Sequence, residues 1–125
     1  MPIQNYAPLK GCLEPVVIES AALTNQLGDP QQREVVVYLP EGYAEATDTY
    51  PLFVDLVGFT GSGPAHVGWK AFAETVPQRV ERLIAEGLMG KVILAFPDCF
   101  TALGGNQYID SDVMGQWATF LTEIW

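Results

Sequence analysis

Basic residues are scarce in this chain: 6 lysines and arginines stand against 15 acidic residues in 125, for a formal net charge of −9. That balance opposes binding to a nucleic-acid backbone or an anionic membrane surface, because both carry negative charge. The basic residues are also scattered along the chain, so they form no patch that could follow a row of phosphates. We therefore expect no nucleic-acid partner and no membrane partner.

Histidine and cysteine are nearly absent: His66 is the single histidine, and Cys12 and Cys99 are the two cysteines. One histidine excludes a histidine-based metal cluster, and the cysteines lack the CxxC spacing of zinc and redox motifs. The sequence therefore predicts no metal and no cofactor, and two reduced thiols in a cytoplasmic protein. Met1-Pro2-Ile3 is followed by polar residues, so we also expect neither a secretory leader nor a membrane span.

Apolar residues make up 49% of the chain and charged residues 17%, as in a folded domain. At this length we expect one domain, near the lower size for a sheet covered on both faces. Strand patterns occur at Glu14–Leu23, Arg33–Leu39, Leu52–Val57 and Lys91–Phe96, and helix patterns at Pro77–Glu86 and Val113–Trp125, with a helical turn at Trp69–Glu74. The order β-β-β-α-β-α predicts an α/β fold with an antiparallel hairpin followed by a right-handed parallel crossover.

The apolar strand at Leu52–Val57 runs without a break into the glycine-rich loop Gly58–Pro64. Enzymes with α/β sheets keep their sites at the carboxyl ends of strands, where such a loop presents backbone N–H groups. A phosphate-binding role is disfavoured, because Trp69 interrupts the Walker spacing before Lys70 and the glycines do not form Gly-x-Gly-x-x-Gly.

No serine of the chain stands in a Gly-x-Ser-x-Gly nucleophile turn; Ser20, Ser62 and Ser111 all fail this test. Cys99 and His66 each follow a strand and could form a thiol–imidazole pair, although a buried inert thiol is the commoner outcome.

Three polar residues near the strand ends have alternative roles. Asp55 lies within a strand pattern, where we expect a hydrogen bond at the sheet. Asp98 fits either a turn cap or a pocket wall, and Tyr108 fits either loop packing or a pocket wall.

Several segments in order resemble one group of the α/β-hydrolase superfamily, which contains esterase D, the enterochelin esterases and the antigen 85 acyltransferases. The segments are Arg33–Tyr43, Tyr50-Pro-Leu52, Leu56-Val-Gly-Phe59, Arg82–Gly87, Phe96-Pro-Asp98 and Gly104–Ser111. The resemblance covers about three quarters of the chain, from Arg33 to Trp125.

This resemblance implies a serine esterase or thioesterase whose nucleophile Ser, Asp and His would all lie beyond Trp125. The backbone N–H of Phe59 would be one donor of the oxyanion hole, with Gly58 and Gly61 shaping the loop and Asp98 and Tyr108 lining the pocket. Residues 1–125 would be a single partial domain that ends before the nucleophile elbow, an incomplete three-layer sandwich. Alone, it is expected to be inactive.

The resembled topology also implies the sheet order 1-2-4-3, which places Leu52–Val57 at an edge. Natural edge strands are short, charged or covered, whereas this segment is apolar. We therefore expect a partner along it, either the remainder of the hydrolase or a second copy of the chain. The alternative to a partial esterase is a non-catalytic binding or oligomerising module built on the same half-fold.

Overall fold

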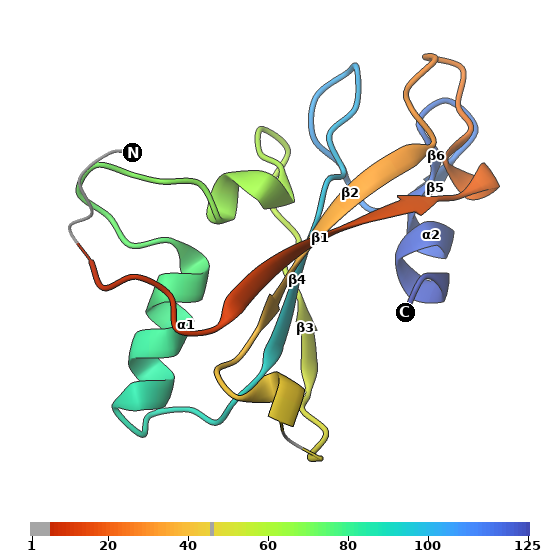
Figure 1. Cartoon of the computed structure of the whole chain (residues 1–125). Helices are drawn as coiled ribbons and strands as arrows, with labels where there is room; N and C mark the ends of the chain where they lie inside the picture. The colour runs from red at the N-terminus through yellow and green to blue at the C-terminus, as the bar shows by residue number, and fades with distance from the viewer. Residues whose placement is uncertain (1–5, 46) are drawn as a thin grey trace.

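The computed structural model of the chain describes residues 6–45 and 47–125. Its main feature is a mixed sheet of four strands in the order β1-β2-β4-β3 (Figure 1). The strands are β1 at Cys12–Glu19, β2 at Gln32–Leu39, β3 at Leu52–Val54 and β4 at Ile93–Pro97. β2 is antiparallel to β1 and to β4, and β3 is parallel to β4. The expected hairpin, parallel crossover and edge position of the third strand are all present.

Two strands end earlier than the sequence pattern predicts. The first strand ends at Glu19 rather than Leu23, because Ser20 caps a short 3-10 helix, η1 (Ala21–Leu23), through its hydroxyl. The third ends at Val54 rather than Val57, although the amide of Asp55 still donates to the carbonyl of Ala95 over 2.8 Å. Beyond Asp55 the chain leaves the sheet, so Leu56 and Val57 belong to the loop.

Helix α1 (Val76–Ala85) begins where the sequence indicates. Thr75 and Gln78 form a capping box, in which each side chain bonds the other residue's backbone N–H, and Pro77 occupies the first turn. At the other end Gly87 has a φ of 72°, the left-handed conformation that terminates helices.

The remaining elements depart further from expectation. Trp69–Glu74 is not helical; the turn predicted there occurs earlier, as the 3-10 helix η3 at Gly63–His66. The last helix, α2, spans Trp117–Glu123 rather than Val113–Trp125, because the preceding residues form a small hairpin of β5 (Asp110–Ser111) and β6 (Gly115–Gln116). A further 3-10 helix, η2, covers Tyr43–Glu45.

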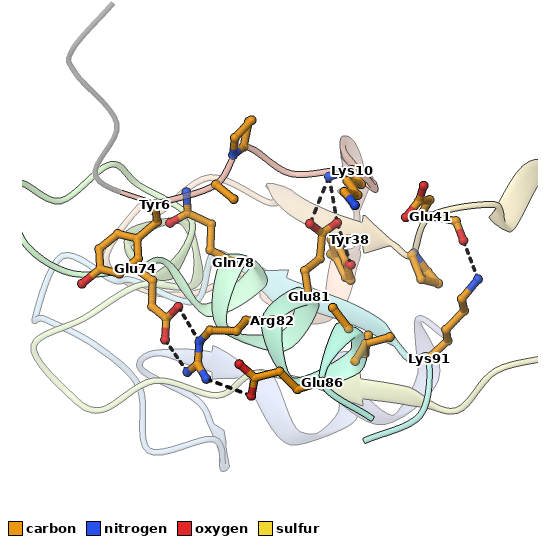
Figure 2. A pocket seen from close by; sticks show the side chains of 15 residues that line it. Tyr6, Lys10, Tyr38, Glu41, Glu74, Gln78, Glu81, Arg82, Glu86 and Lys91 are labelled. Atoms are coloured by element: carbon orange, nitrogen blue, oxygen red, sulfur yellow. Dashed lines mark hydrogen bonds and ion pairs between the residues drawn. The ribbon is translucent and has the colours of Figure 1, made fainter. Parts of the chain in front are cut away.

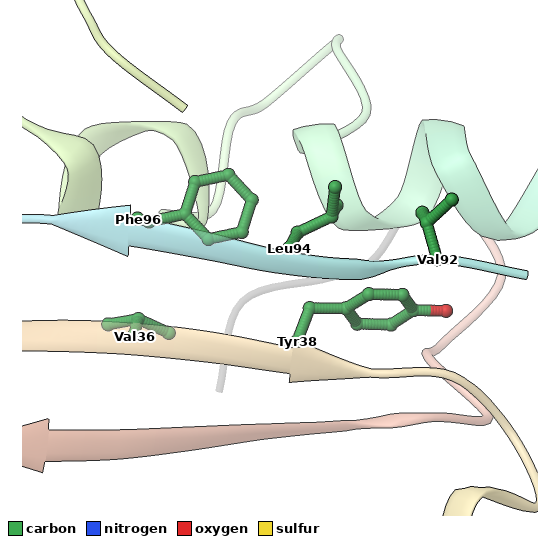
Figure 3. Close-up of a cluster of buried hydrophobic side chains, with 5 residues drawn as sticks. All are labelled: Val36, Tyr38, Val92, Leu94 and Phe96. Carbon is green, nitrogen blue, oxygen red and sulfur yellow. The ribbon is translucent and has the colours of Figure 1, made fainter. Parts of the chain in front are cut away.

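The larger core cluster lies between the sheet and α1 (Figure 3). Alternate residues of β2 and β4 point towards this helix, and Val76 and Val80 of α1 pack against them. The buried members are Val36, Tyr38, Val92, Leu94 and Phe96.

A second cluster, around α2, contains Leu23, Cys99, Trp117 and Phe120, with Leu121 and Ile124 packed against it. The sequence predicts the inner side of the last helix as Trp117, Phe120, Leu121 and Ile124, and all four lie in or against this cluster. Figure 1 shows α2 on the opposite side of the sheet from α1, at the end of the long β1–β2 hairpin. The opposite face is therefore covered only in part, and Val16 and Leu52 on it are each 42% exposed. The expected three-layer arrangement is thus incomplete.

Within the described residues, no helix is long and apolar enough to cross a membrane. The expectation about a leader at Met1-Pro2-Ile3 falls outside the described residues.

Candidate functional site

The loop after β3 forms a tight turn that leaves backbone donors free. The N–H of Gly61 donates to the carbonyl of Gly58 over 3.0 Å, which places Phe59 and Thr60 at the two central positions of a β-turn. Neither N–H of these central residues has a hydrogen-bond partner in the described parts of the chain. The turn can therefore donate hydrogen bonds to an anionic oxygen.

Gly58 and Gly61 lie on either side of these donors, and neither adopts a positive φ. A side chain at position 58 would meet nothing within 4 Å. Their place in the structure is thus compatible with the loop-shaping role expected from the sequence, and the open space beside Gly58 leaves room for a bound group.

The turn is fixed to the rest of the fold through the carbonyl of Phe59, which accepts the N–H of Gly105. A methyl group at position 105 would overlap the backbone of Phe59, so only glycine allows this approach. The ring of Phe59 packs beside Gly104 and is still 49% exposed. The Gly104-Gly105 pair therefore serves as the platform for the turn.

Asp98 links the loop to the sheet and the loop that follows it. One carboxylate oxygen accepts the hydroxyl of Ser62 at 3.0 Å and the N–H of Phe100 at 3.1 Å. The other lies 3.5 Å from the guanidinium of Arg33. These contacts make Asp98 a turn cap, which is one of its two expected roles.

Arg33 is a residue that the sequence reasoning did not single out. Only 4% of it is exposed, and its guanidinium donates to the carbonyls of Pro30 and Phe100. It also lies 5.0 Å from the ring centroid of Trp117, in cation–π contact. Its position two residues before Val35 was the available signal, because the period of two in a strand puts both residues on the same face.

Tyr108 bonds the start of the loop, since its hydroxyl donates to the carbonyl of Val57. Its backbone has a φ of 59°, held by a hydrogen bond from its N–H to the side chain of Asn106 at 2.7 Å. Burial raises the pKa of the Tyr108 phenol, and the nearby charges of Cys99 and Asp55 raise it further. Tyr108 thus stays protonated and remains a donor at neutral pH.

The single histidine pairs with a carboxylate at the end of β3. Nδ1 of His66, the last residue of η3, contacts Oδ2 of Asp55. The sequence predicts a hydrogen bond at the sheet for Asp55, and it offers Cys99 as a partner for His66; the contact between Asp55 and His66 was not predicted. The spacing could have suggested the observed pair, because both residues flank the same loop.

Cys99 does not act as the partner of His66. The thiol is buried in the second cluster, and burial raises its pKa to about 12, with the negative charge of Asp98 adding to the effect. A thiolate is therefore disfavoured near neutral pH, and the thiol–imidazole alternative is not supported.

A cavity of about 380 Å³ lies elsewhere, between the N-terminal segment, the end of β2 and α1 (Figure 2). Its polar groups are bonded to one another. Glu81 accepts the N–H groups of Lys10 and Gly11 and the hydroxyl of Tyr38, and Glu74 accepts the guanidinium of Arg82. The contacts of Glu81 hold the N-terminal segment against α1. The cavity is therefore part of the scaffold, and no residue of the loop lines it.

No residue group of the described chain combines three or more metal-binding side chains. The polar arrangement around the loop is thus a set of N–H donors, two carboxylates, a phenol and an imidazole. This set can stabilise an anion and exchange protons.

Comparison with known proteins gives a structural likeness alone. No family model matches the sequence, and no curated protein sequence matches it. Among solved structures, a ferulic acid esterase superposes with a TM-score of 0.71 at 22% sequence identity. The likeness covers 93% of this chain and 42% of that chain, so this chain spans less than half the length of that esterase. At this identity the likeness establishes a shared fold of α/β character.

Proposed function

We propose that the chain is the N-terminal part of a serine carboxylesterase or thioesterase of the α/β-hydrolase superfamily, within the group of esterase D, the enterochelin esterases and antigen 85. The fold shared with a ferulic acid esterase over 93% of the chain supports an esterase. The observation that carries the role of the loop is the turn at Gly58–Gly61, whose central N–H groups are unpaired within the described residues.

In this proposal the N–H of Phe59 donates to the oxyanion that forms when a serine attacks the ester carbonyl. One such donor contributes roughly 3 kcal/mol at the transition state, or about two powers of ten in rate. Gly105 and Asp98 hold the turn from two sides, so the donor is preorganised. Asp98 and Tyr108 border the same loop through Ser62 and Val57, and we propose them as pocket-lining residues.

The nucleophile, its acid and its histidine come from polypeptide outside the 125 residues. The partner surface that we propose is the edge of β3, continued by the open face of the sheet. Leu52 and Phe53 are 42% and 52% exposed at this edge, where natural strands are normally covered. An added strand on β3 would bury these side chains and complete the site.

Substitutions at Phe59 in the native gene product test the proposed donor. Phe59→Pro removes the N–H, and proline is favoured at this central turn position, so the turn itself should persist. We expect kcat for p-nitrophenyl acetate to fall about 10²-fold or more, as for loss of other oxyanion donors. Phe59→Ala keeps the N–H and is the matched control, with kcat close to wild type.

The same gene product identifies the nucleophile. A fluorophosphonate probe should label one serine on a Gly-x-Ser-x-Gly turn, in a polypeptide whose intact mass exceeds that of this chain. A native product with the mass of this chain and no labelled serine would overturn the proposal. That result would favour the second candidate, a non-catalytic oligomerising module, which the exposed edge at Leu52 and Phe53 also supports.

A further inference from the structure

We propose that Asp55 and His66 form a proton-transfer pair at the end of β3, which activates water for attack on an activated aryl ester. The pair borders the same loop as the proposed esterase function, but it uses none of the residues that this function takes from outside the chain. The inference can therefore succeed or fail independently of the serine mechanism, and its success would replace the expectation that the chain alone is inactive.

The contact between the two side chains fixes the form of the imidazole. A carboxylate only accepts hydrogen bonds, so Oδ2 of Asp55 requires the hydrogen on Nδ1 of His66. The lone pair is then on Nε2, the nitrogen that acts as the base. A carboxylate orients the histidine of serine hydrolases in the same way.

Both members of the pair are anchored, yet both can be reached from solvent. The backbone N–H of Asp55 bonds Ala95 of β4, and η3, which carries His66, packs so closely on β4 that a side chain at Gly63 would overlap the backbone of Phe96. The side chains of His66 and Asp55 are 36% and 27% exposed. Nε2 of His66 has no hydrogen-bond partner in the described parts of the chain.

Backbone hydrogen-bond donors lie in the same short segment as the pair. The turn with the free N–H groups of Phe59 and Thr60 lies between Asp55 and His66 in sequence. The charge of Asp55 reaches Tyr108, whose pKa it raises, and Tyr108 in turn bonds Val57 at the start of the loop. The base and the donors therefore belong to one short segment of the chain.

Water is the nucleophile in this proposal, because the other candidates are engaged. The hydroxyl of Ser62 donates to Asp98, and Cys99 is buried with its pKa raised to about 12. Nε2 of His66 takes one proton from the water as its oxygen bonds to the acyl carbon. The bond from this carbon to the aryloxy oxygen then breaks, and the phenolate leaves with the electron pair. The imidazolium returns its proton to solvent, so ester and water give a carboxylic acid and a phenol.

The test is hydrolysis of p-nitrophenyl acetate by the 125-residue chain over a range of pH, followed as release of p-nitrophenolate. We expect a second-order rate constant about 10² times that of N-acetylhistidine, at the low end for a positioned base. The rate should be insensitive to fluorophosphonate. The insensitivity separates this activity from that of a serine esterase.

Three variants identify the groups responsible. His66→Gln should lose the activity, Asp55→Asn should lower it towards the rate of N-acetylhistidine, and Asp48→Asn, a matched change at an exposed aspartate, should leave it unchanged. A wild-type rate no higher than that of N-acetylhistidine, or an unchanged rate in folded His66→Gln, would overturn the proposal.

A measurement on the wild-type chain covers the case in which Asp55→Asn fails to fold. Because His66 is the single histidine, long-range ¹H–¹⁵N correlation spectra report its tautomer without assignment. We expect the hydrogen on Nδ1; a hydrogen on Nε2 would contradict the pair.

Discussion

The N–H of Gly105 donates a hydrogen bond to the carbonyl of Phe59, and this contact joins the loop after β3 to the loop after β4. The two loops follow neighbouring parallel strands, so they meet at the same end of the sheet. The carbonyl of Phe59 is thereby held by the second loop, while the N–H groups of Phe59 and Thr60 have no partner within the described residues. Substitutions along this connection should affect both stability and the geometry of the turn.

Gly105→Ala should destabilise the chain, because the added methyl group would overlap the backbone of Phe59. We expect a loss of about 2 kcal/mol in the free energy of unfolding, typical of overpacking. Gly90→Ala is the matched control, since nothing lies within 4 Å of a side chain at that exposed position. Urea denaturation measures both. Equal midpoints for the two variants would show that the loops are not closely packed here.

Arg33→Met should also destabilise the chain, because the guanidinium is the partner of Asp98 and of two backbone carbonyls. We expect a loss of roughly 2–3 kcal/mol, below the range for a fully buried pair since Asp98 is in contact with water. Arg79→Met, at a guanidinium that is 60% exposed, should change stability by less than about 0.5 kcal/mol. Thermal denaturation followed by circular dichroism would compare them, and a similar loss in both variants would argue against a special role for Arg33.

The two cysteines should differ sharply in reactivity. Cys12 is exposed, with its pKa raised by desolvation and by the charge of Glu14, whereas Cys99 is buried with a pKa raised to about 12. We expect one equivalent of 5,5′-dithiobis(2-nitrobenzoate) to react quickly with the native chain at pH 8, and two in denaturing urea. The Cys12→Ser variant should show no fast equivalent. A fast reaction at Cys99 would instead support the hypothesis that its thiol pairs with His66.

Asp110 should make stability depend on acid pH. Its carboxylate accepts the N–H and the hydroxyl of Thr119 in the first turn of α2, and these bonds lower its pKa from the ordinary value of 3.8. A carboxyl group whose pKa is lower in the folded chain stabilises the fold above the unfolded pKa, and the stabilisation is lost as pH falls through the folded pKa.

The prediction for Asp110→Asn follows from this direction of the pH dependence of stability. At pH 6 the variant should melt at a lower temperature than wild type, and the difference should shrink below pH 3.8 as the wild-type carboxyl is protonated. Melting curves at a series of pH values measure this. A difference that persists unchanged at pH 2 would mean that the charge of Asp110 is not what stabilises α2.

Local patterns in the sequence were sufficient for much of the scaffold. Three features carry signals that depend only on neighbouring residues. They are the apolar run of the strand at Val35–Val37, the cap of the helix at Thr75 and the end of that helix at Gly87. The hairpin and the parallel crossover then follow from order and turn length. The edge position of β3 additionally required the family resemblance.

The departures occur where contacts distant in sequence decide the structure. β3 stops after Val54 because the following loop is held by Tyr108, Gly105 and Asp98 from another part of the chain. α2 starts at Trp117 because the preceding residues pair as a small hairpin instead of continuing the apolar helical pattern. Neither effect is visible in a window of neighbouring residues.

In the candidate site, too, the features set by neighbouring residues were predicted and those set by distant contacts were not. The glycine-rich loop was identifiable because its composition is local, and its turn now accounts for the unpaired donors. The pairing of His66 with Asp55 was not predicted, because the identity of a residue does not tell in which direction its side chain points. The buried position of Arg33 became clear only once Asp98, Phe100 and Trp117 were seen to surround it.

The position of β2 and β4 within the sheet has a consequence for how the molecule opens. Each of these strands has hydrogen-bonded neighbours on both sides, whereas β1 and β3 lie at the margins. Amide hydrogens of Val36 and Phe96, which are paired between β2 and β4, should therefore exchange with deuterium slowest, by global unfolding, while those around Phe53 exchange through local fraying. The edge of β3, which we propose as the partner surface, is thus also the part of the sheet that opens most readily.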